Sequence, residues 1–392
     1  MNTTTDYFNI ESYLTEEQIL IKQSTRSWVN KYIKPHIESY YQNGTVPENW
    51  SNELASIGAY GLIIPMEYGG TEADYIAYGL MMQELERGDT TVRVMSSIQT
   101  SLVMYAIWKY GNDLQKEKYL PKLATGEYTS AFGLTEPNHG SNPAAMHSYF
   151  KPDKNDKDHI ILNGSKLWIG NASHADIAIV WAKNDMGKIQ GIIIETANTD
   201  NFTNAKIDAK WSFRTSNTGE LIFSDSKIKK EQILAKSTSL PDAYECLNIG
   251  RYAVAWGSIG IAIDCYECAL KYAVQREQFG NPIARYQLIQ KKLAEMITEI
   301  TKAQLLCHQL GKLMDKGEAN YKQISMAKRN NVDMAHKIAK DARQILGGMG
   351  ITSDYPVMRH ILNLETLITY QGTHEMHLLI TGKDITGISA FH

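Results

Sequence analysis

The chain has 392 residues, of which 40 are basic and 43 acidic, so its formal net charge is −3. Charges of both signs are mixed along the sequence, which argues against nucleic acid or a membrane surface as a partner. The length allows roughly two to three domains with a large core. The first residues carry acids and lack a basic stretch followed by an apolar run, so we expect no secretory signal or transit peptide and assign the protein to the cytoplasm.

The first part of the sequence, from about Leu14 to Gly126, has helical periodicity interrupted by Gly/Pro turns such as IIPMEYGG. Between Tyr128 and Leu234, short isoleucine-rich segments alternate with loops of Asn, Asp, Gly and Lys. This alternation is typical of strands. The middle of the chain is therefore predicted to form a small antiparallel barrel or sandwich.

Helical periodicity returns after Pro241 and continues to the end. One long helix carries an apolar stripe formed by Ile289, Leu293, Met296, Ile300, Cys307 and Leu310. A four-helix bundle fits this region. We therefore predict an α+β fold with an N-terminal helical domain over residues 1–127, a middle antiparallel β-barrel over residues 128–236 and a C-terminal four-helix bundle over residues 237–392.

A metal site is not expected. The chain has four cysteines, namely Cys246, Cys265, Cys268 and Cys307. They are too few and too irregular for a disulfide framework, and no second pair or suitably spaced histidine follows Cys265 and Cys268, so buried thiols on one helix face are the better interpretation. The tetrad HEMH, from His374 to His377, lacks the i, i+4 histidine spacing of a zinc helix, so we expect structural or cofactor-side roles there.

Several polar or glycine-rich stretches are candidate binding sites. In AFGLTEPNHGSN, the hydroxyls of Thr135 and Ser141 suit a polar ligand such as a flavin edge or a phosphate, although the stretch also reads as an ordinary Pro/Gly loop. In KLWIGN, Trp168 can stack on a planar ring or belong to the core. In QREQFGNPIARYQ, Arg276 is a natural phosphate partner, or a surface arginine.

Two further candidates are a glycine turn and a single arginine. QILGGMG ends a helix, and its Gly347 and Gly348 allow backbone N–H groups to approach an anion, while a plain C-cap is the alternative. Arg93 follows the helix end that contains ELER. A lone arginine predicts little by itself, because most are solvated.

Taken together, these stretches resemble the acyl-CoA dehydrogenase family, and within it most of all the glutaryl-CoA dehydrogenases. The resemblance covers essentially the whole chain and rests on MMQELERGD, LTEPNHGSN, CLNIGRYAVAWGSIG, QREQFGNPIARYQLIQKKLAEMITEI, QILGGMGI, VMRHILNLE and ITGISAF, in the family's order. It implies FAD as cofactor, an acyl-CoA thioester as substrate, a homotetramer, and electron-transfer flavoprotein as an optional partner. It also implies the same three-domain fold.

The resemblance assigns roles to individual residues. Those matching positions around the flavin ring are Phe132, Leu134, Thr135, Trp168, Gly170, Thr373 and Glu375. Those matching the motif that contacts FAD of a neighbouring subunit are Arg276, Phe279, Gln287, Gln344 and Gly348. Those matching positions along the thioester arm are Ser141, Asn248, Arg251, Tyr370 and Gly372. Arg93 matches the arginine that pairs with a distal carboxylate, which a guanidinium grips bidentately, and Glu86 matches an acidic residue in the same pocket.

The sequence departs from the family at the catalytic base. The family removes the α-proton with the glutamate of a Tyr-Glu-Gly-Thr turn, while a hydride leaves the β-carbon for the flavin. Here Gln371 replaces that glutamate, and an amide does not accept a proton at neutral pH. Some members carry the base instead directly before the residue matched by Arg251, but Gly250 stands at that place.

Two neighbouring positions differ as well: Gly170 replaces the threonine of a Trp-Ile-Thr motif, and Val94 replaces a serine beside Arg93. A general base contributes about a hundred- to ten-thousand-fold to rate, so its loss would disable an ordinary dehydrogenase. We therefore favour a flavoenzyme that eliminates or transfers an anionic group, like relatives that release sulfite from a sulfinate-bearing acyl-CoA. The alternatives are a dehydrogenase with another base, such as Glu86 or Glu375, or with an inactivating Glu-to-Gln change, a non-catalytic acyl-CoA-binding protein, and a flavin-dependent oxygenase.

Overall fold

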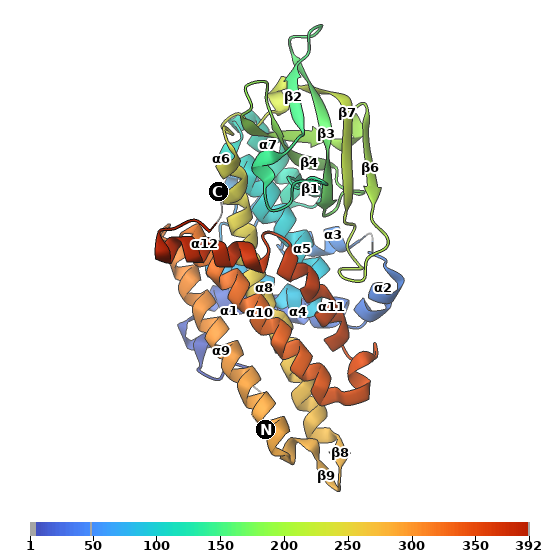
Figure 1. Cartoon of the computed structure of the whole chain (residues 1–392), viewed down its shortest axis with the longest axis vertical. Coiled ribbons are helices and arrows are strands. Elements are labelled where there is room, and N and C mark those ends of the chain that lie inside the picture. The colour runs from blue at the N-terminus through green and yellow to red at the C-terminus, as the bar shows by residue number, and fades with distance from the viewer. Residues whose placement is uncertain (1–4, 48, 391–392) are drawn as a thin grey trace.

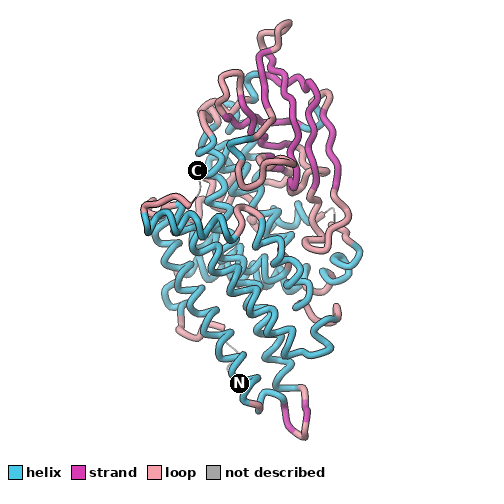
Figure 2. Tube along the Cα trace, in the orientation of Figure 1, coloured by secondary structure: helices cyan, strands magenta, loops and turns pink. Residues whose placement is uncertain are grey.

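The computed structural model describes residues 5–47 and 49–390. Helices of the N-terminal part lead into a sheet, and long helices follow to the end of the described chain (Figure 1). Figure 2 shows most strands gathered at one end of the elongated molecule, with helices filling the remainder. The predicted α+β class and the order helix, strand, helix are confirmed.

The N-terminal part is built around a buried helix. Its helices are α1 (Glu16–Trp28), α2 (Ile37–Asn43), α3 (Trp50–Ser56), α4 (Tyr75–Gly88), α5 (Thr90–Ser97), α6 (Tyr105–Tyr110) and α7 (Asp113–Ala124). Shorter turns are η1 (Ile10–Tyr13), η2 (Val29–Ile33), η3 (Met66–Tyr68) and η4 (Ile98–Met104), of which η2 and η4 are π-helical. Every residue of α4 from Ile76 to Gly88 is buried, so this helix lies at the centre of the fold.

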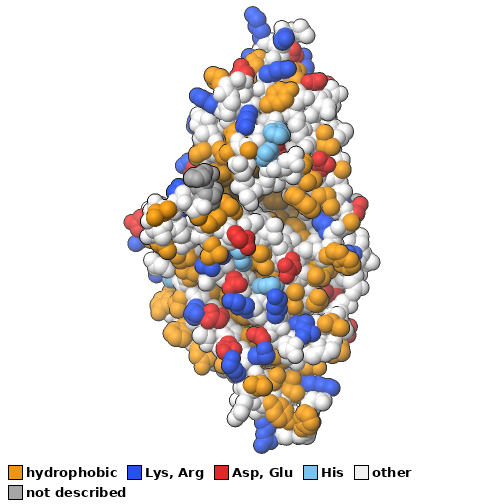
Figure 3. All heavy atoms as spheres, viewed as in Figure 1, with side chains coloured by type: hydrophobic (Ala, Val, Ile, Leu, Met, Phe, Trp, Pro, Cys, Tyr) orange, Lys and Arg blue, Asp and Glu red, His pale blue; other side chains and the backbone are white. Residues whose placement is uncertain are grey.

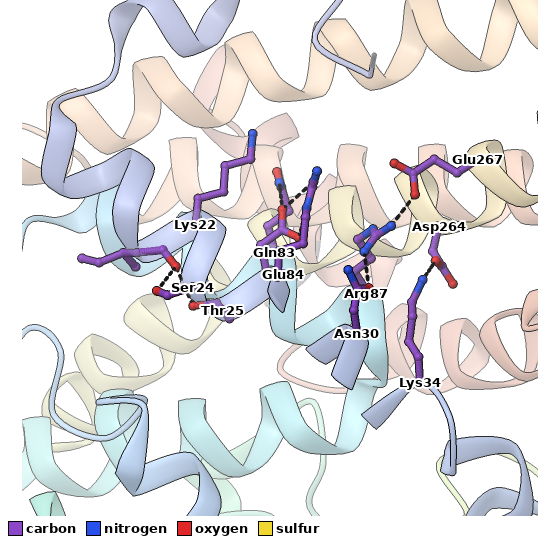
Figure 4. A network of polar contacts seen from close by, with 12 residues as sticks. Lys22, Ser24, Thr25, Asn30, Lys34, Gln83, Glu84, Arg87, Asp264 and Glu267 are labelled. Atoms are coloured by element: carbon purple, nitrogen blue, oxygen red, sulfur yellow. Dashed lines mark hydrogen bonds and ion pairs between the residues drawn. The ribbon is translucent and has the colours of Figure 1, made fainter. Parts of the chain in front are cut away.

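Polar contacts fasten the first helix to this centre (Figure 4). Arg26 of α1 donates from Nε to Oε2 of Glu84 at 2.8 Å, and the Glu84 side chain has no exposed surface. Lys34, which follows η2, forms an ion pair with Asp264 of the long helix α8 (Leu240–Gln275). A buried carboxylate without a partner costs several kcal/mol, on the order of 3–5. These pairs therefore fix the N-terminal helices on α4 and α8.

The middle part is one curled seven-stranded sheet. Its strands are β1 (Ser130–Gly133), β2 (Tyr149–Pro152), β3 (His159–Ile169), β4 (Ile177–Lys183), β5 (Ile189–Glu195), β6 (Phe202–Lys206) and β7 (Gly219–Lys229), in the order β1-β4-β2-β3-β7-β6, with β5 also on β4. Short turns are η5 (Pro143–Ala145), η6 (Thr196–Asn198) and η7 (Lys230–Gln232).

The prediction of an all-antiparallel barrel is wrong in one respect. β1 runs parallel to β4, with Ser130 opposite Ile177, and Tyr149 of β2 also pairs with β4 in the parallel sense. A local pattern of apolar residues reports that a segment is a strand but not the direction of a partner that lies dozens of residues away. The other pairings are antiparallel.

The C-terminal part is dominated by long helices. They are α8, α9 (Gln287–Asp315), α10 (Tyr321–Leu346), α11 (Val357–Thr369) and α12 (His374–Thr386), with η8 (Ile283–Arg285) and η9 (Gly347–Ile351) between them. A hairpin of β8 (Glu277–Gln278) and β9 (Asn281–Pro282) joins α8 to α9 at the far tip (Figure 1). The predicted apolar stripe of α9 is confirmed, since Leu293, Met296, Ile300, Cys307 and Leu310 are buried and Ile289 is half-buried.

Helix α8 is long and apolar. It is the one helix in residues 5–47 and 49–390 whose length and composition would permit a membrane crossing, but 83% of its apolar window is buried inside the protein. It packs on both α4 and α10. The apolar character of α8 is thus explained by its central place in the core.

The face in Figure 3 shows positive and negative side chains intermixed over the helices.

Candidate functional site

Arg93 and its partners form the charged part of the site, which we call the Arg93 cluster (Glu86, Arg93, Ser97 and Tyr370). Arg93 lies on α5 and is completely buried. Its Nε pairs with Glu86 from the end of α4, its Nη1 donates to Ser97 Oγ at 3.3 Å, and its Nη2 donates to Tyr370 OH. Burial opposes the charge of Arg93, but the Glu86 carboxylate and Tyr370 raise its pKa above the ordinary value. The Arg93 guanidinium is therefore charged although protein encloses it. Burial raises the pKa of the neighbouring Glu86 carboxyl group.

The turn after α11 holds an unusual backbone conformation. Gln371 has φ 53° and Gly372 has φ 100°, so two successive residues are left-handed. Arg251 of α8 donates from Nε to the Gln371 carbonyl oxygen at 2.8 Å. Thr373 accepts a hydrogen bond from Met376 N at 3.3 Å and caps α12. These contacts fix the direction in which the Gln371 side chain leaves the turn.

A buried lysine that sequence reasoning missed also holds this turn. Lys328 of α10 donates from Nζ to the carbonyl oxygens of Leu367 at 2.7 Å, Tyr370 at 3.1 Å and Gly372 at 2.9 Å. Burial, with Arg251 and Arg93 nearby, lowers the pKa of Lys328 to about 7. The sequence did contain a signal, because Lys328 lies four residues after Ile324 on the apolar face of its helix, where a lysine is rare.

Gly250 and Gln371, the two positions that the sequence resemblance matches to the family's base, are adjacent in space. A Cβ atom built on Gly250 would lie 3.0 Å from Gln371 Nε2, 3.1 Å from Gln371 Oε1 and 3.2 Å from Leu102 Cδ2. The Gln371 Oε1 atom is buried and has no hydrogen-bond partner among the described residues. A buried polar atom without a partner is uncommon and marks a place where a ligand group can donate.

The side chain of Ile98 fills the space beside Gly170. A Cβ atom built on Gly170 would lie 2.5 Å from Ile98 Cδ1, closer than real Cβ atoms approach other atoms. Ile98 is the first residue of η4, directly after α5. The space that a side chain at position 170 would take is therefore occupied by Ile98. We call Gln371, Gly250, Leu102, Gly170 and Ile98 the Gln371 cluster.

The predicted flavin-ring residues of the sheet lie close together. Trp168 is the extra residue of a β-bulge between Leu167 and Ile169, has φ 64° and is 60% exposed. A bulge re-aims a side chain, which here leaves an indole uncovered by this chain. Leu167 N donates to the Thr135 carbonyl oxygen at 2.9 Å, which brings the Thr135 loop beside Trp168. The exposed indole suits stacking on a planar cofactor, and Phe132 and Leu134 are buried.

Other predicted site residues lie elsewhere. Those near the far tip and the end of α10 are exposed, namely Arg276, Phe279, Gln287, Gln344 and Gly348. The hairpin beside Phe279 lies at the opposite end of the molecule from the sheet domain, so one chain does not bring these residues to the turn (Figure 1). Ser141 is exposed in its loop. Asn248 accepts from Arg251 Nη1 at 3.0 Å, which joins it to the turn.

The residues after the turn differ in burial. Glu375 is exposed in the first turn of α12. His377 is fully buried, and a Cβ atom built on Gly372 would lie 2.9 Å from its Nε2. Burial and the cations Lys328 and Arg251 lower the pKa of His377 to about 3, so its ring is neutral. Among the described residues, no group of three or more potential metal ligands is present, and Cys265 and Cys268 are free thiols.

Comparisons with known proteins agree on the family. The descriptions "Acyl-CoA dehydrogenase, N-terminal domain", "middle domain" and "C-terminal domain" match residues 15–127, 131–226 and 240–386. The chain is 37% identical to an acyl-CoA dehydrogenase of Bacillus subtilis over 96% of this chain and 99% of that protein. It is 33% identical to a glutaryl-CoA dehydrogenase of Desulfococcus multivorans over 96% and 98%.

Solved structures give the same result. A glutaryl-CoA dehydrogenase from Mycobacterium smegmatis has a TM-score of 0.96 and 44% identity, covering 99% of both chains. A second structure from that organism, a glutaryl-CoA dehydrogenase in complex with FADH2, has a TM-score of 0.95 and 39% identity, covering 98% of both chains. The chain belongs to the acyl-CoA dehydrogenase family, whose members are FAD-dependent enzymes.

Proposed function

We propose that this chain is an FAD-binding enzyme that acts on a short acyl-CoA with a distal anionic group, and that it breaks the bond to that group without first removing an α-proton. The observation that carries the proposal is the packing of Gln371 against Gly250, with 3.0 Å from Gln371 Nε2 to a Cβ built on Gly250. The two positions at which related enzymes carry the base thus meet, and neither holds a carboxylate.

The Arg93 cluster supports an anionic acyl group. Glu86 occupies the Nε side of Arg93, while Nη1 has only the 3.3 Å contact to Ser97 and remains the better donor for an incoming group. Charge-assisted hydrogen bonds are about twice as strong as neutral ones, and a buried setting strengthens them further. A carboxylate or sulfinate at the end of a short acyl chain matches this donor.

The proposed step balances without an external oxidant or reductant. The carbon–sulfur bond of a sulfinate, or the carbon–carbon bond of a carboxylate, breaks, and SO2 or CO2 leaves. The acyl carbon keeps the electron pair of that bond and takes up one proton from water, and the hydroxide that remains combines with SO2 or CO2 to give hydrogen sulfite or bicarbonate. The buried cations Arg93, Arg251 and Lys328 would stabilise the negative charge that develops on the acyl group. Gln371 would donate a hydrogen bond where a glutamate carboxylate would repel the anion.

We assign the cofactor to two groups of residues. Phe132, Leu134, Thr135, Trp168, Gly170 and Thr373 would hold the flavin ring, with Glu375 on the outer side of the turn. A bound flavin would supply a planar electron-accepting ring. The 92% exposure of Phe279, next to the exposed Arg276, favours a second contact with FAD of a neighbouring subunit in a homotetramer.

The test is an anaerobic titration of the FAD-loaded protein with glutaryl-, succinyl- and 3-sulfinopropionyl-CoA. Visible spectra of the flavin and masses of the products are recorded together. We expect an acyl-CoA that has lost its anionic group while the flavin stays oxidised. Flavin bleaching that accompanies an enoyl-CoA product, with or without loss of the anionic group, would contradict the proposal.

A glutaryl-CoA-type dehydrogenase is the second candidate, with Glu86 as the base. It is favoured by the burial of Glu86 beside Arg93, which raises the Glu86 pKa toward that of a proton acceptor. Against it, Nε and Nη2 of Arg93 engage both carboxylate oxygens. This candidate predicts that glutaryl-CoA bleaches the flavin and that Glu86→Gln abolishes the bleaching. It also predicts that an electron-transfer flavoprotein reoxidises the reduced flavin.

A further inference from the structure

One face of the α5–η4 helix forms an apolar stripe made of Val94, Ile98 and Leu102, which follow one another at intervals of four residues. Each retains a little accessible surface, 6%, 7% and 5% respectively, whereas Val92 and Val103 have none. Residues four apart share a helix face. The stripe therefore borders accessible space, while Val92 and Val103 are enclosed in the core.

The stripe contacts both glycines of the Gln371 cluster. Ile98 Cδ1 lies 2.5 Å from a Cβ built on Gly170, and Leu102 Cδ2 lies 3.2 Å from one built on Gly250. A hydroxyl-bearing side chain at position 170 is thus incompatible with Ile98 in its present rotamer. Glycine at position 170 and isoleucine at position 98 therefore belong to one packing arrangement.

The neighbouring face of the same helix is polar. Arg93 and Ser97 each precede a stripe residue by one position, and they donate and accept within the Arg93 cluster. A ligand beside this helix therefore meets a guanidinium at one end and aliphatic carbon along its length. Aliphatic side chains offer no partner to a hydroxyl that has left water, so a substituted chain binds less well.

We propose that Ile98, together with Val94 and Leu102, selects acyl chains that carry no polar substituent between the thioester and the terminal anion. This inference rests on the proposed function for the identity of the ligand. The favoured class is an unsubstituted short dicarboxylyl- or sulfinoacyl-CoA. A chain with a hydroxyl on its middle carbons is rejected by the stripe, even though its terminal anion still suits Arg93.

Calorimetric titration of the oxidised, FAD-loaded protein tests this selection. The ligands are glutaryl-CoA, 3-hydroxyglutaryl-CoA and butyryl-CoA, and the variants are Ile98→Thr and Ile98→Val. The two variants lose similar volume, but only threonine offers a hydroxyl. We expect the wild type to prefer glutaryl- over 3-hydroxyglutaryl-CoA by about tenfold or more, Ile98→Thr to reduce that ratio, and Ile98→Val to keep it.

The outcomes separate this inference from the proposed function. Equal binding of the two dicarboxylyl ligands by the wild type, or equal changes of the ratio in both Ile98 variants, would overturn the selection by Ile98. Failure of the wild type to prefer glutaryl-CoA over butyryl-CoA would instead remove the distal anion from the proposed function. Discrimination against the hydroxyl would still stand in that case, because it compares two ligands with the same terminal carboxylate.

Discussion

The Arg93 cluster is held together by charged hydrogen bonds, whereas the Gln371 cluster is held together by close packing of small and apolar groups. In the Arg93 cluster, the guanidinium contacts Glu86, Ser97 and Tyr370, and these four residues form a closed polar network. In the second, Gln371 Oε1 lacks a partner among the described residues, and two glycines make room for their neighbours.

The two clusters differ in how well they tolerate a change of a single residue. A network of buried charges tolerates the loss of no single member, because the remaining charge is left without a partner. A packed contact instead couples the two residues that share the space, as Ile98 and Gly170 do. Under the proposed function, the Arg93 cluster would hold the anionic acyl group, and the Gln371 cluster would lie beside the reacting carbons without a carboxylate.

The largest effect is expected when Gln371 is changed to Glu, which places a base in the Gln371 cluster. Glutaryl-CoA should then reduce the flavin about a hundredfold faster or more, measured by anaerobic stopped-flow absorbance. Loss of the anionic group should slow, because a carboxylate repels it. Gln371→Asn is the matched control without a base. An unchanged rate of flavin reduction in Gln371→Glu would show that position 371 does not face the α-carbon.

The second effect concerns the Arg93 cluster. Arg93→Met leaves the fully buried Glu86 without its partner, so the free energy of unfolding should fall by about 3–5 kcal/mol in urea titrations. Arg93→Met combined with Glu86→Gln should recover most of that loss, since no charge is then left unpaired. Both proteins should lose the preference for glutaryl- over butyryl-CoA. A double variant as unstable as the single one would contradict the charge argument.

The third effect tests the packing between Ile98 and Gly170. Gly170→Ala should destabilise the protein by about 1–3 kcal/mol, because the new Cβ overlaps Ile98 Cδ1. Ile98→Val removes that methyl group. Gly170→Ala should therefore lower the free energy of unfolding by clearly less in the Ile98→Val protein than in the wild type. A thermodynamic cycle of unfolding free energies measures this coupling. Additive effects of the two substitutions would show that the residues do not constrain each other.

Much of the fold was predictable from the sequence, because helical periodicity and isoleucine-rich segments are local signals. The parallel pairing of β1 with β4 was not, since strand direction depends on a distant partner. Arg93 and Glu86 were predicted in one pocket, and the structure brings them into contact. Tyr370 was predicted along the thioester arm, and its contact with Arg93 was not foreseen. The contact between Gly250 and Gln371 and the filling of position 170 by Ile98 involve residues far apart in the chain, which no short motif reports.

The effect expected of Lys328 depends on pH. Burial lowers its pKa to about 7 in the folded state, below the value of about 10.4 for an unfolded chain. Between these values the unfolded state binds more protons, so stability rises with pH as the folded protein loses the buried charge. Below pH 7 both states are protonated, and Lys328 contributes no slope.

The measurement compares the wild type with Lys328→Met, which removes the titrating group and its three carbonyl contacts. The difference in unfolding free energy between the two proteins should grow in favour of the wild type from pH 7 to about pH 10. Lys340→Met, at an exposed position of the same helix, is the matched control and should show no such trend. A difference that stays constant across this range would mean that Lys328 keeps an ordinary pKa, and that hydrogen bonds to the turn carbonyls compensate fully for its burial.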